Sequence, residues 1–226
     1  MKKVRTHLED RVLPSYTKGE EIFNMVSHIV GGAIGLIGMV LCIIFSAIHQ
    51  NSYAIVGSII YGISMIFLYT MSSIYHGLKP TRKAKKVMQI LDHCTIYVLI
   101  AGTYTPILLS SIMKVDQVAA WTMLAIVWIF AILGIVLNAI DLKQFRVFSM
   151  ICYIAMGWCI IFRIDLVIKS LGMTGFILIL LGGIIYTLGT ILYGIGRKVK
   201  YMHSMFHLCV VIGTLLQLIA IILYVV

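Results

Sequence analysis

Residues 22–48 read IFNMVSHIVGGAIGLIGMVLCIIFSAI, an apolar run without any Asp, Glu, Lys or Arg side chain. A helix of about 20 apolar residues is long enough to cross the hydrocarbon core of a bilayer. Comparable runs recur at about 53–77, 88–113, 118–140, 145–168, 173–195 and 201–226. The pattern predicts an all-α membrane protein, in which residues 1–226 form a single domain of seven transmembrane helices packed as a bundle.

The composition supports a lipid environment. Hydrophobic residues make up 61% of the chain and charged residues only 12%, and the mean hydropathy is +1.05. Soluble domains carry about twice that share of charged residues. The net charge of +10 comes from short basic segments between the apolar runs, which does not suggest a nucleic-acid-binding surface. We therefore expect a multi-pass protein of the cell membrane whose partners are membrane lipids. The sequence leaves its oligomeric state open.

The basic segments predict the orientation of the chain. Loops rich in Lys and Arg stay in the cytoplasm. Fifteen of the 18 Lys and Arg residues fall on one side of the predicted bundle: Lys2, Lys3, Arg5, Arg11, Lys18, Lys79, Arg82, Lys83, Lys85, Lys86, Lys143, Arg146, Arg197, Lys198 and Lys200. We expect residues 1–21 to form a cytoplasmic N-terminal segment and the C-terminus to lie outside the cell.

Polar residues cluster at the predicted cytoplasmic ends of the spans. Glu21, Asn24 and His28 are spaced so that they share one helix face, and Ser72 lies one turn from His76. Asp92 opens the third span. His203 and His207 open the last one and are four residues apart, a spacing that lets two imidazoles bind one metal ion. Ionisable groups at membrane depth usually mark a functional site.

Simpler interpretations apply to several of these residues. An isolated histidine at a helix end is more often a hydrogen-bonded side chain than a metal ligand, which is our interpretation of His7, His49 and His93. Glu21 can also be explained as an acid in the first turn of a helix, where the helix dipole favours it. Arg163 and Asp165, near the outer end of the fifth span, are interpreted as a local charge pair.

Four motifs in order along the chain resemble those of the hemolysin III and progestin and adiponectin receptor (PAQR) family. They are Glu21-x-x-Asn24-x-x-Ser27-His28, Ser72-x3-His76, Leu91-Asp92-His93 and His203-x3-His207. The compact chain is most similar to the bacterial hemolysin III branch. The resemblance implies a zinc ion on the cytoplasmic side, held by His76, His203 and His207 with a water as the fourth ligand. It also implies that Asp92 holds this water and that Ser72 supports the site. His93 departs from the pattern of the eukaryotic receptors.

The resemblance leaves the function open between three classes. Three protein ligands and a water describe a catalytic zinc site, and the wider superfamily includes alkaline ceramidases, so the first hypothesis is hydrolysis of a membrane lipid amide or ester. The second is a receptor-like or membrane-homeostasis protein in which zinc is structural. The third, from the family's name, is cytolytic activity, which the pattern of resident membrane spans does not favour.

Overall fold

The structure, a computed structural model, describes residues 5–226, so Lys2 and Lys3 lie outside the described part of the chain. Within this range every regular element is a helix, which confirms the all-α prediction. The elements are α1 (Lys18–Ile48), α2 (Ser52–Gly77), α3 (Lys83–Pro106), η1 (Ile107–Ser111), η2 (Ile112–Lys114), α4 (Gln117–Trp158), η3 (Cys159–Arg163), α5 (Ile164–Ile195) and α6 (Met202–Tyr224).

Two helices begin earlier than the apolar runs that predicted them. α1 begins at Lys18 because Thr17 and Glu20 form a capping box: the Thr17 hydroxyl accepts from the Glu20 N–H, and the Glu20 carboxylate accepts from the Thr17 N–H. α3 begins at Lys83, five residues before the predicted start at 88. Hydropathy locates only the part of a helix that suits lipid, and both helices continue past it into a polar first turn.

α4 folds back on itself at Asp141. The backbone leaves helical geometry there, with φ −159° and ψ 95°. Asn138 accepts a hydrogen bond of 2.6 Å from Ser149, and it donates another to Tyr153. In a straight helix, residues 138 and 149 would be about 16 Å apart along the axis. The two halves of α4 therefore lie side by side, and the bend matches the predicted link between residues 140 and 145.

Residues 145–168, the predicted fifth span, do not form one continuous helix. α4 ends at Trp158, and the 3₁₀ segment η3 follows. The Tyr104 hydroxyl stabilises this break, because it donates to the Gly157 carbonyl and accepts from the Ile160 N–H. α5 then bends at Gly172, where φ is +71°, a conformation that glycine adopts at little cost.

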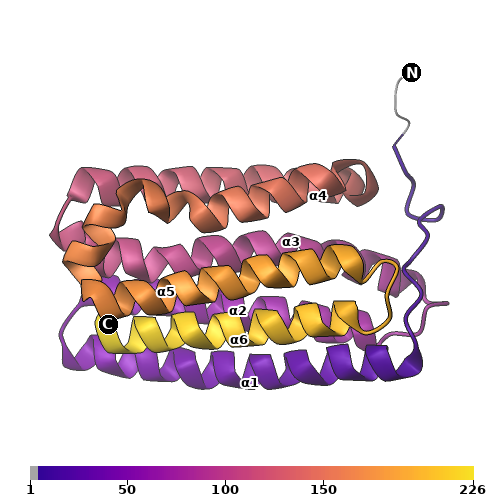
Figure 1. Cartoon of the computed structure of the whole chain (residues 1–226), viewed down its shortest axis with the longest axis horizontal. Helices are drawn as coiled ribbons and strands as arrows, with labels where there is room; N and C mark the ends of the chain where they lie inside the picture. The colour runs from indigo at the N-terminus through magenta and orange to yellow at the C-terminus, as the bar shows by residue number, and fades with distance from the viewer. Residues whose placement is uncertain (1–4) are drawn as a thin grey trace.

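Five helical stretches in the described chain are long and apolar enough to cross a membrane. The fourth covers residues 117–195 and contains both bends. Figure 1 shows the consequence: helical segments run alongside one another, with the start of α1 and the C-terminus at opposite ends of the bundle. Large apolar side chains such as Ile37, Ile129 and Ile151 are more than half exposed on its surface, as expected for lipid-facing residues.

Contacts between distant segments define the two ends of this bundle. At one end, here called the basic end, the Arg5 side chain donates to the Ile140 carbonyl, the Thr6 N–H donates to Asp141, and the Tyr201 N–H donates to Glu20. The N-terminal segment, the bend of α4 and the α5–α6 link therefore meet there.

At the opposite end, Asn51 donates to Ser110, and Ser110 donates to the Val225 carbonyl near the C-terminus. Arg163 pairs with Asp165 at this end, as predicted, and also with Asp116. The nitrogen–oxygen distance is 3.4 Å in both pairs. These contacts place the links α1–α2 and α3–α4 and the C-terminal residues together, away from the basic end.

Glycines allow close helix packing in the bundle. A Cβ atom on Gly31 would lie 2.5 Å from the Tyr69 ring, and one on Gly38 would lie equally close to Leu218. Gly57 is more restrictive, because its Cβ would lie 2.6 Å from the Cα atom of Pro106, which cannot rotate away. Small residues at such contacts let helix backbones approach one another in lipid.

We expect Gly57→Ala to destabilise the bundle by about 1–3 kcal/mol, because the added methyl group forces α2 away from α3. The matched control is Gly183→Ala, since a Cβ at Gly183 meets no atom within 4 Å. Thermal unfolding in detergent measures both variants. Equal melting temperatures for the two alanine variants would contradict the packing described here.

The Asp141 carboxylate gives the basic end a pH-dependent link. Burial by itself would raise the pKa of Asp141, but hydrogen bonds from the N–H groups of Thr6, Gln144 and Lys143 outweigh burial and hold the pKa below its ordinary value. The stability that this carboxylate contributes is therefore complete above about pH 4, the pKa of an unfolded Asp, and is lost as the pH falls through the lower folded value.

We therefore expect the melting temperature of the wild type to exceed that of Asp141→Asn at about pH 6, and this difference to shrink toward about pH 3. The contributions of all other carboxylates cancel in this difference of melting temperatures, because both proteins contain them. A difference that stays constant across this pH range would contradict the role of the ionised Asp141.

Candidate metal centre

Three histidines from two helices face one another at the basic end. His76 lies in the last turn of α2, and His203 and His207 lie in the first two turns of α6. One ring nitrogen from each can be chosen so that all three lie within 4.8 Å of one another, and all three residues are buried. The Nε2 atoms of His203 and His207 are 3.0 Å apart. The i, i+4 spacing on α6 places these two rings on the same face.

A carboxylate orients the His76 ring. Glu21 Oε2 lies 2.6 Å from His76 Nδ1, and the Asn24 amide nitrogen lies 3.5 Å from the same atom. With a neutral imidazole, Nδ1–H donates to Glu21, and Nε2 carries the free lone pair. His76 Nε2 is buried and has no hydrogen-bond partner among residues 5–226. A histidine whose outer nitrogen donates to a carboxylate is the usual arrangement in a metal site.

His28 has the same relation to His207. Its Nε2 atom lies 2.8 Å from His207 Nδ1, and its ring packs edge-on against Tyr69. The outer nitrogen of His207 is thereby occupied, so that its Nε2 atom is the one directed at His203. Glu21, Asn24 and His28, which the sequence placed on one face of α1, therefore line the histidine group from outside, each within reach of a His76 or His207 ring nitrogen.

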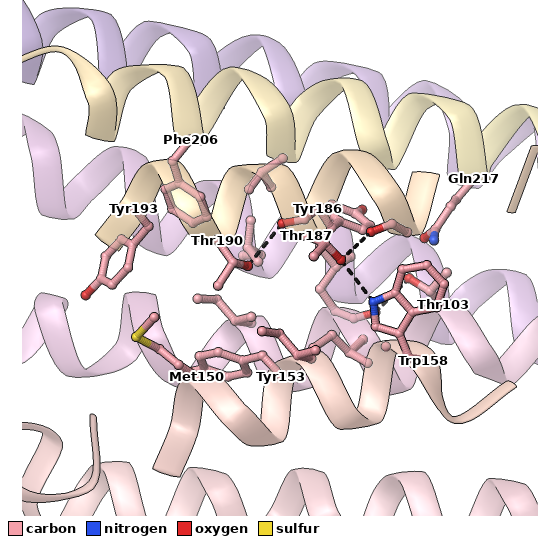
Figure 2. A pocket seen from close by; sticks show the side chains of 18 of the residues that line it. Thr103, Met150, Tyr153, Trp158, Tyr186, Thr187, Thr190, Tyr193, Phe206 and Gln217 are labelled. Carbon is pink, nitrogen blue, oxygen red and sulfur yellow. Dashed lines mark hydrogen bonds between the residues drawn. The ribbon is translucent and has the colours of Figure 1, made fainter. Parts of the chain in front are cut away.

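A cavity of about 170 Å³ adjoins the histidine group. Its polar end includes His203, His207, Asp92 and Ser72, and the Ser72 hydroxyl is buried without a partner in the described chain. The rest of the cavity is mainly apolar and lies between α3, the second half of α4, α5 and α6. Figure 2 shows part of this lining, with Tyr193 and Phe206 toward one end and Trp158 and Gln217 toward the other.

Asp92 and His93 are adjacent on α3 but differ in their surroundings. Both ring nitrogens of His93 have partners: Nδ1 lies 2.8 Å from the Gln89 carbonyl and Nε2 lies 3.2 Å from the Tyr193 hydroxyl. This agrees with the interpretation of His93 as a hydrogen-bonded side chain. The Asp92 carboxylate lies 3.8 Å from His93 Nδ1 and is partly exposed to the cavity.

Sequence reasoning missed two residues of the centre. Lys85 was interpreted only as a topology signal, yet it is 1% exposed and its Nζ atom lies 2.6 Å from Glu21 Oε1. Its spacing from Gln89 and Asp92, i, i+4 and i+7, could have revealed that it shares a helix face with the aspartate. Tyr16 lies outside every apolar run, and no pattern in the sequence indicated its position.

The N-terminal segment covers the histidine group. Residues 5–17 run across the basic end (Figure 1), held there by the hydrogen bond from the Thr6 N–H to Asp141. Tyr16 stacks on His203, with ring centroids 4.7 Å apart and planes 16° apart. Burial, together with nearby Tyr75, raises the pKa of Tyr16 above its ordinary range, so the ring carries a neutral hydroxyl.

The fold and this centre define a polytopic helical membrane protein with a buried histidine group at one end. A sequence model of the family described as "Haemolysin-III related" matches residues 16–218. The "Hemolysin-3 homolog" of Bacillus subtilis (strain 168) is 37% identical over 209 residues, covering 92% of this chain and 96% of the relative. "Hemolysin-3" of Bacillus cereus is 37% identical over 206 residues, covering 91% of this chain and 92% of the relative. The chain belongs to the haemolysin III-related family and is a multi-pass integral membrane protein.

We expect Tyr16→Ala to expose the histidine group to water at the basic end. Diethyl pyrocarbonate modifies accessible neutral imidazoles, so the rate of modification of His203, read from peptide masses, should rise several-fold. Tyr53→Ala is the control, because Tyr53 is 55% exposed and lies at the start of α2, at the opposite end of the bundle. Equal rates in the two variants would mean that Tyr16 does not shield the centre.

Proposed function

We propose that the protein crosses the membrane seven times, with the basic end in the cytoplasm and the C-terminus outside. The bends at Asp141 and Gly172 support the count, because they divide residues 117–195 into three segments. The basic links support the orientation, since the α2–α3 link, the α4 bend and the α5–α6 link all meet the N-terminal segment at one end. The histidine group then lies near the cytoplasmic surface.

The metal that suits this group is zinc. Three imidazoles are a usual ligand set for catalytic zinc, and a tetrahedral site with bonds of about 2.0–2.1 Å needs ligand nitrogens about 3.3 Å apart. The Nε2 atoms of His203 and His207, 3.0 Å apart, are close to this spacing. His76 Nε2, buried without a partner among residues 5–226, is an atom that a metal would satisfy. Glu21 and His28 hold the outer nitrogens of His76 and His207, so that the Nε2 atoms of these two rings are left for a metal ion.

For the reaction we propose hydrolysis of a membrane lipid amide or ester. A zinc ion bound to the three histidines would supply Lewis-acid polarisation and a water of lowered pKa. Asp92, which lines the cavity with His203 and His207, would act as the general base and take up a proton at its carboxylate. The Ser72 hydroxyl, buried and without a partner among residues 5–226, would donate to a substrate or water oxygen.

One observation carries this proposal: His203 and His207 of the histidine group line a mainly apolar cavity inside the helix bundle together with Asp92. Such a cavity takes the acyl chain of a lipid, and its polar end then receives the amide or ester group. Tyr16 closes the aqueous side above His203, so a substrate would arrive from the membrane and not from the cytoplasm.

The names of the relatives favour a second candidate. The Bacillus cereus protein is called a hemolysin, so lytic activity is a candidate for this chain as well. A third candidate is a receptor-like or membrane-homeostasis role in which zinc only stabilises the bundle, an arrangement that the same three ligands support. Metal content alone does not separate these functions, whereas lipid turnover and lysis assays do.

We expect the purified protein to contain about one zinc ion per chain, and the double variant His203→Ala, His207→Ala to contain almost none. Plasma emission spectroscopy measures both. His49→Ala is the matched control, because His49 follows α1 at the opposite end of the bundle and should leave the zinc content unchanged. Low zinc content in the wild type would remove the metal-dependent function.

We expect the zinc-loaded protein to release fatty acid from at least one of ceramide, N-acyl amino acid or lysophospholipid in mixed micelles. Asp92→Asn should lower this rate at least about 100-fold while zinc stays bound, because it removes the general base. Zinc binding without any turnover would support the structural role instead. Dose-dependent lysis of erythrocytes, unaffected by Asp92→Asn, would support the cytolytic candidate.

A further inference from the structure

Lys85 is the one lysine in the described chain that is both buried and in contact with the metal centre. It lies in the first turn of α3, and its side chain is 1% exposed. Its Nζ atom lies 2.6 Å from Glu21 Oε1 and 2.8 Å from the carbonyl of Leu78, and it lies 5.0 Å from the centre of the Tyr75 ring. A buried ammonium ion is costly unless it is paired. These three contacts pair the charge and fix the position of the Nζ atom.

The two oxygens of Glu21 have different partners. Oε1 accepts from Lys85, and Oε2 faces His76 Nδ1 at 2.6 Å. The carboxylate therefore connects a fixed cation on α3 with a ring on α2. Because Lys85 holds Oε1, the carboxylate plane can turn only if this bond breaks. Oε2 is thus kept as the acceptor for Nδ1–H of His76.

The orientation of His76 depends on this acceptor. A neutral imidazole carries its proton on the nitrogen that has the better acceptor. With Glu21 fixed, the proton stays on Nδ1, and the lone pair of Nε2 is directed at His203 and His207. If Glu21 were free to rotate, His76 would populate both tautomers, and in one of them Nε2 would carry a proton and could not bind a metal.

We propose that Lys85 is a positioning residue of the metal centre: it holds Glu21 so that His76 presents the lone pair of Nε2 to the other two histidines. The expected effect of Lys85 on zinc affinity rests on the metal-binding part of the proposed function. The expected effect of Lys85 on the His76 tautomer does not, because it exists without any metal. A purely structural explanation is that Lys85 caps α2 through the Leu78 carbonyl, and this predicts no change at the His76 ring.

The chain contains a matched control for Lys85. Lys83 lies two residues earlier on α3 and also forms a Lys–Glu ion pair, with Glu9 at 2.8 Å, but its side chain is 81% exposed. Lys83→Met and Lys85→Met thus remove the same chemical group from the same helix turn. Lys85→Arg keeps the charge and tests for rescue. Lys85→Met combined with Glu21→Gln leaves no uncompensated buried charge, in case the single variant does not fold.

The experiment has two measurements on the full-length protein in detergent. In metal-free protein labelled with ¹⁵N-histidine, the nitrogen shifts of His76 report its tautomer, assigned with His76→Gln. Competition with a chromophoric chelator gives the zinc affinity. We expect Lys85→Met to convert His76 from the Nδ1–H form to a tautomer mixture and to weaken zinc binding about 10–100-fold. Lys83→Met should change neither quantity, and Lys85→Arg should restore most of both.

The double variant should bind zinc no more weakly than Glu21→Gln alone, because Lys85 acts through Glu21. An unchanged His76 tautomer in Lys85→Met would overturn the proposal, even if the melting temperature fell. A double variant that binds zinc much more weakly than Glu21→Gln would overturn it as well. If the wild type bound no zinc, the proposed metal function would fail, and the tautomer measurement would still decide the role of Lys85.

Discussion

The interior of a bilayer offers no hydrogen-bond partner to a polar side chain, so a partner within the chain strongly stabilises a buried polar group of this bundle. At the basic end this constraint produces a connected network. Glu21 contacts both Lys85 and His76, and His28 contacts His207. The helices α1, α2, α3 and α6 are joined there by side chains whose removal would leave buried charges or ring nitrogens unpaired. The candidate metal centre is therefore also the polar connection between these four helices.

The remaining helices have a different relation to the centre. The second half of α4 and α5 contribute many apolar side chains to the cavity. Several of their polar groups have partners, as Trp158 has in Thr187 and Tyr186 has in Thr214 of α6. This side of the bundle therefore supplies much of the cavity wall, whereas α1, α2, α3 and α6 supply the three histidines and the side chains that contact them. The bend at Asp141 makes this division possible, because it returns the chain alongside α3 within a few residues.

Much of this architecture could be predicted from the sequence, because a segment that crosses lipid must be apolar and must satisfy its own backbone hydrogen bonds. Long uncharged runs must become helices, and the i, i+4 spacing of His203 and His207 fixes their common face. The position of Tyr16 could not be predicted, since a tyrosine outside an apolar run is compatible with many environments. The spacing of Lys85 could indicate its helix face, but its burial against Glu21 depends on another helix. The 3₁₀ break after Trp158 was also missed, because it depends on the Tyr104 hydroxyl from another helix, and hydropathy does not record such tertiary hydrogen bonds.

The central claim is that His76, His203 and His207 form an open, three-histidine zinc site. X-ray absorption at the zinc edge of the purified protein tests it most directly, because it counts the ligands without requiring a substrate. The account predicts three imidazole nitrogens and one further oxygen at about 2.0–2.1 Å. Sulfur scattering at about 2.3 Å, or a fourth imidazole in place of the oxygen, would contradict an open site built from these residues.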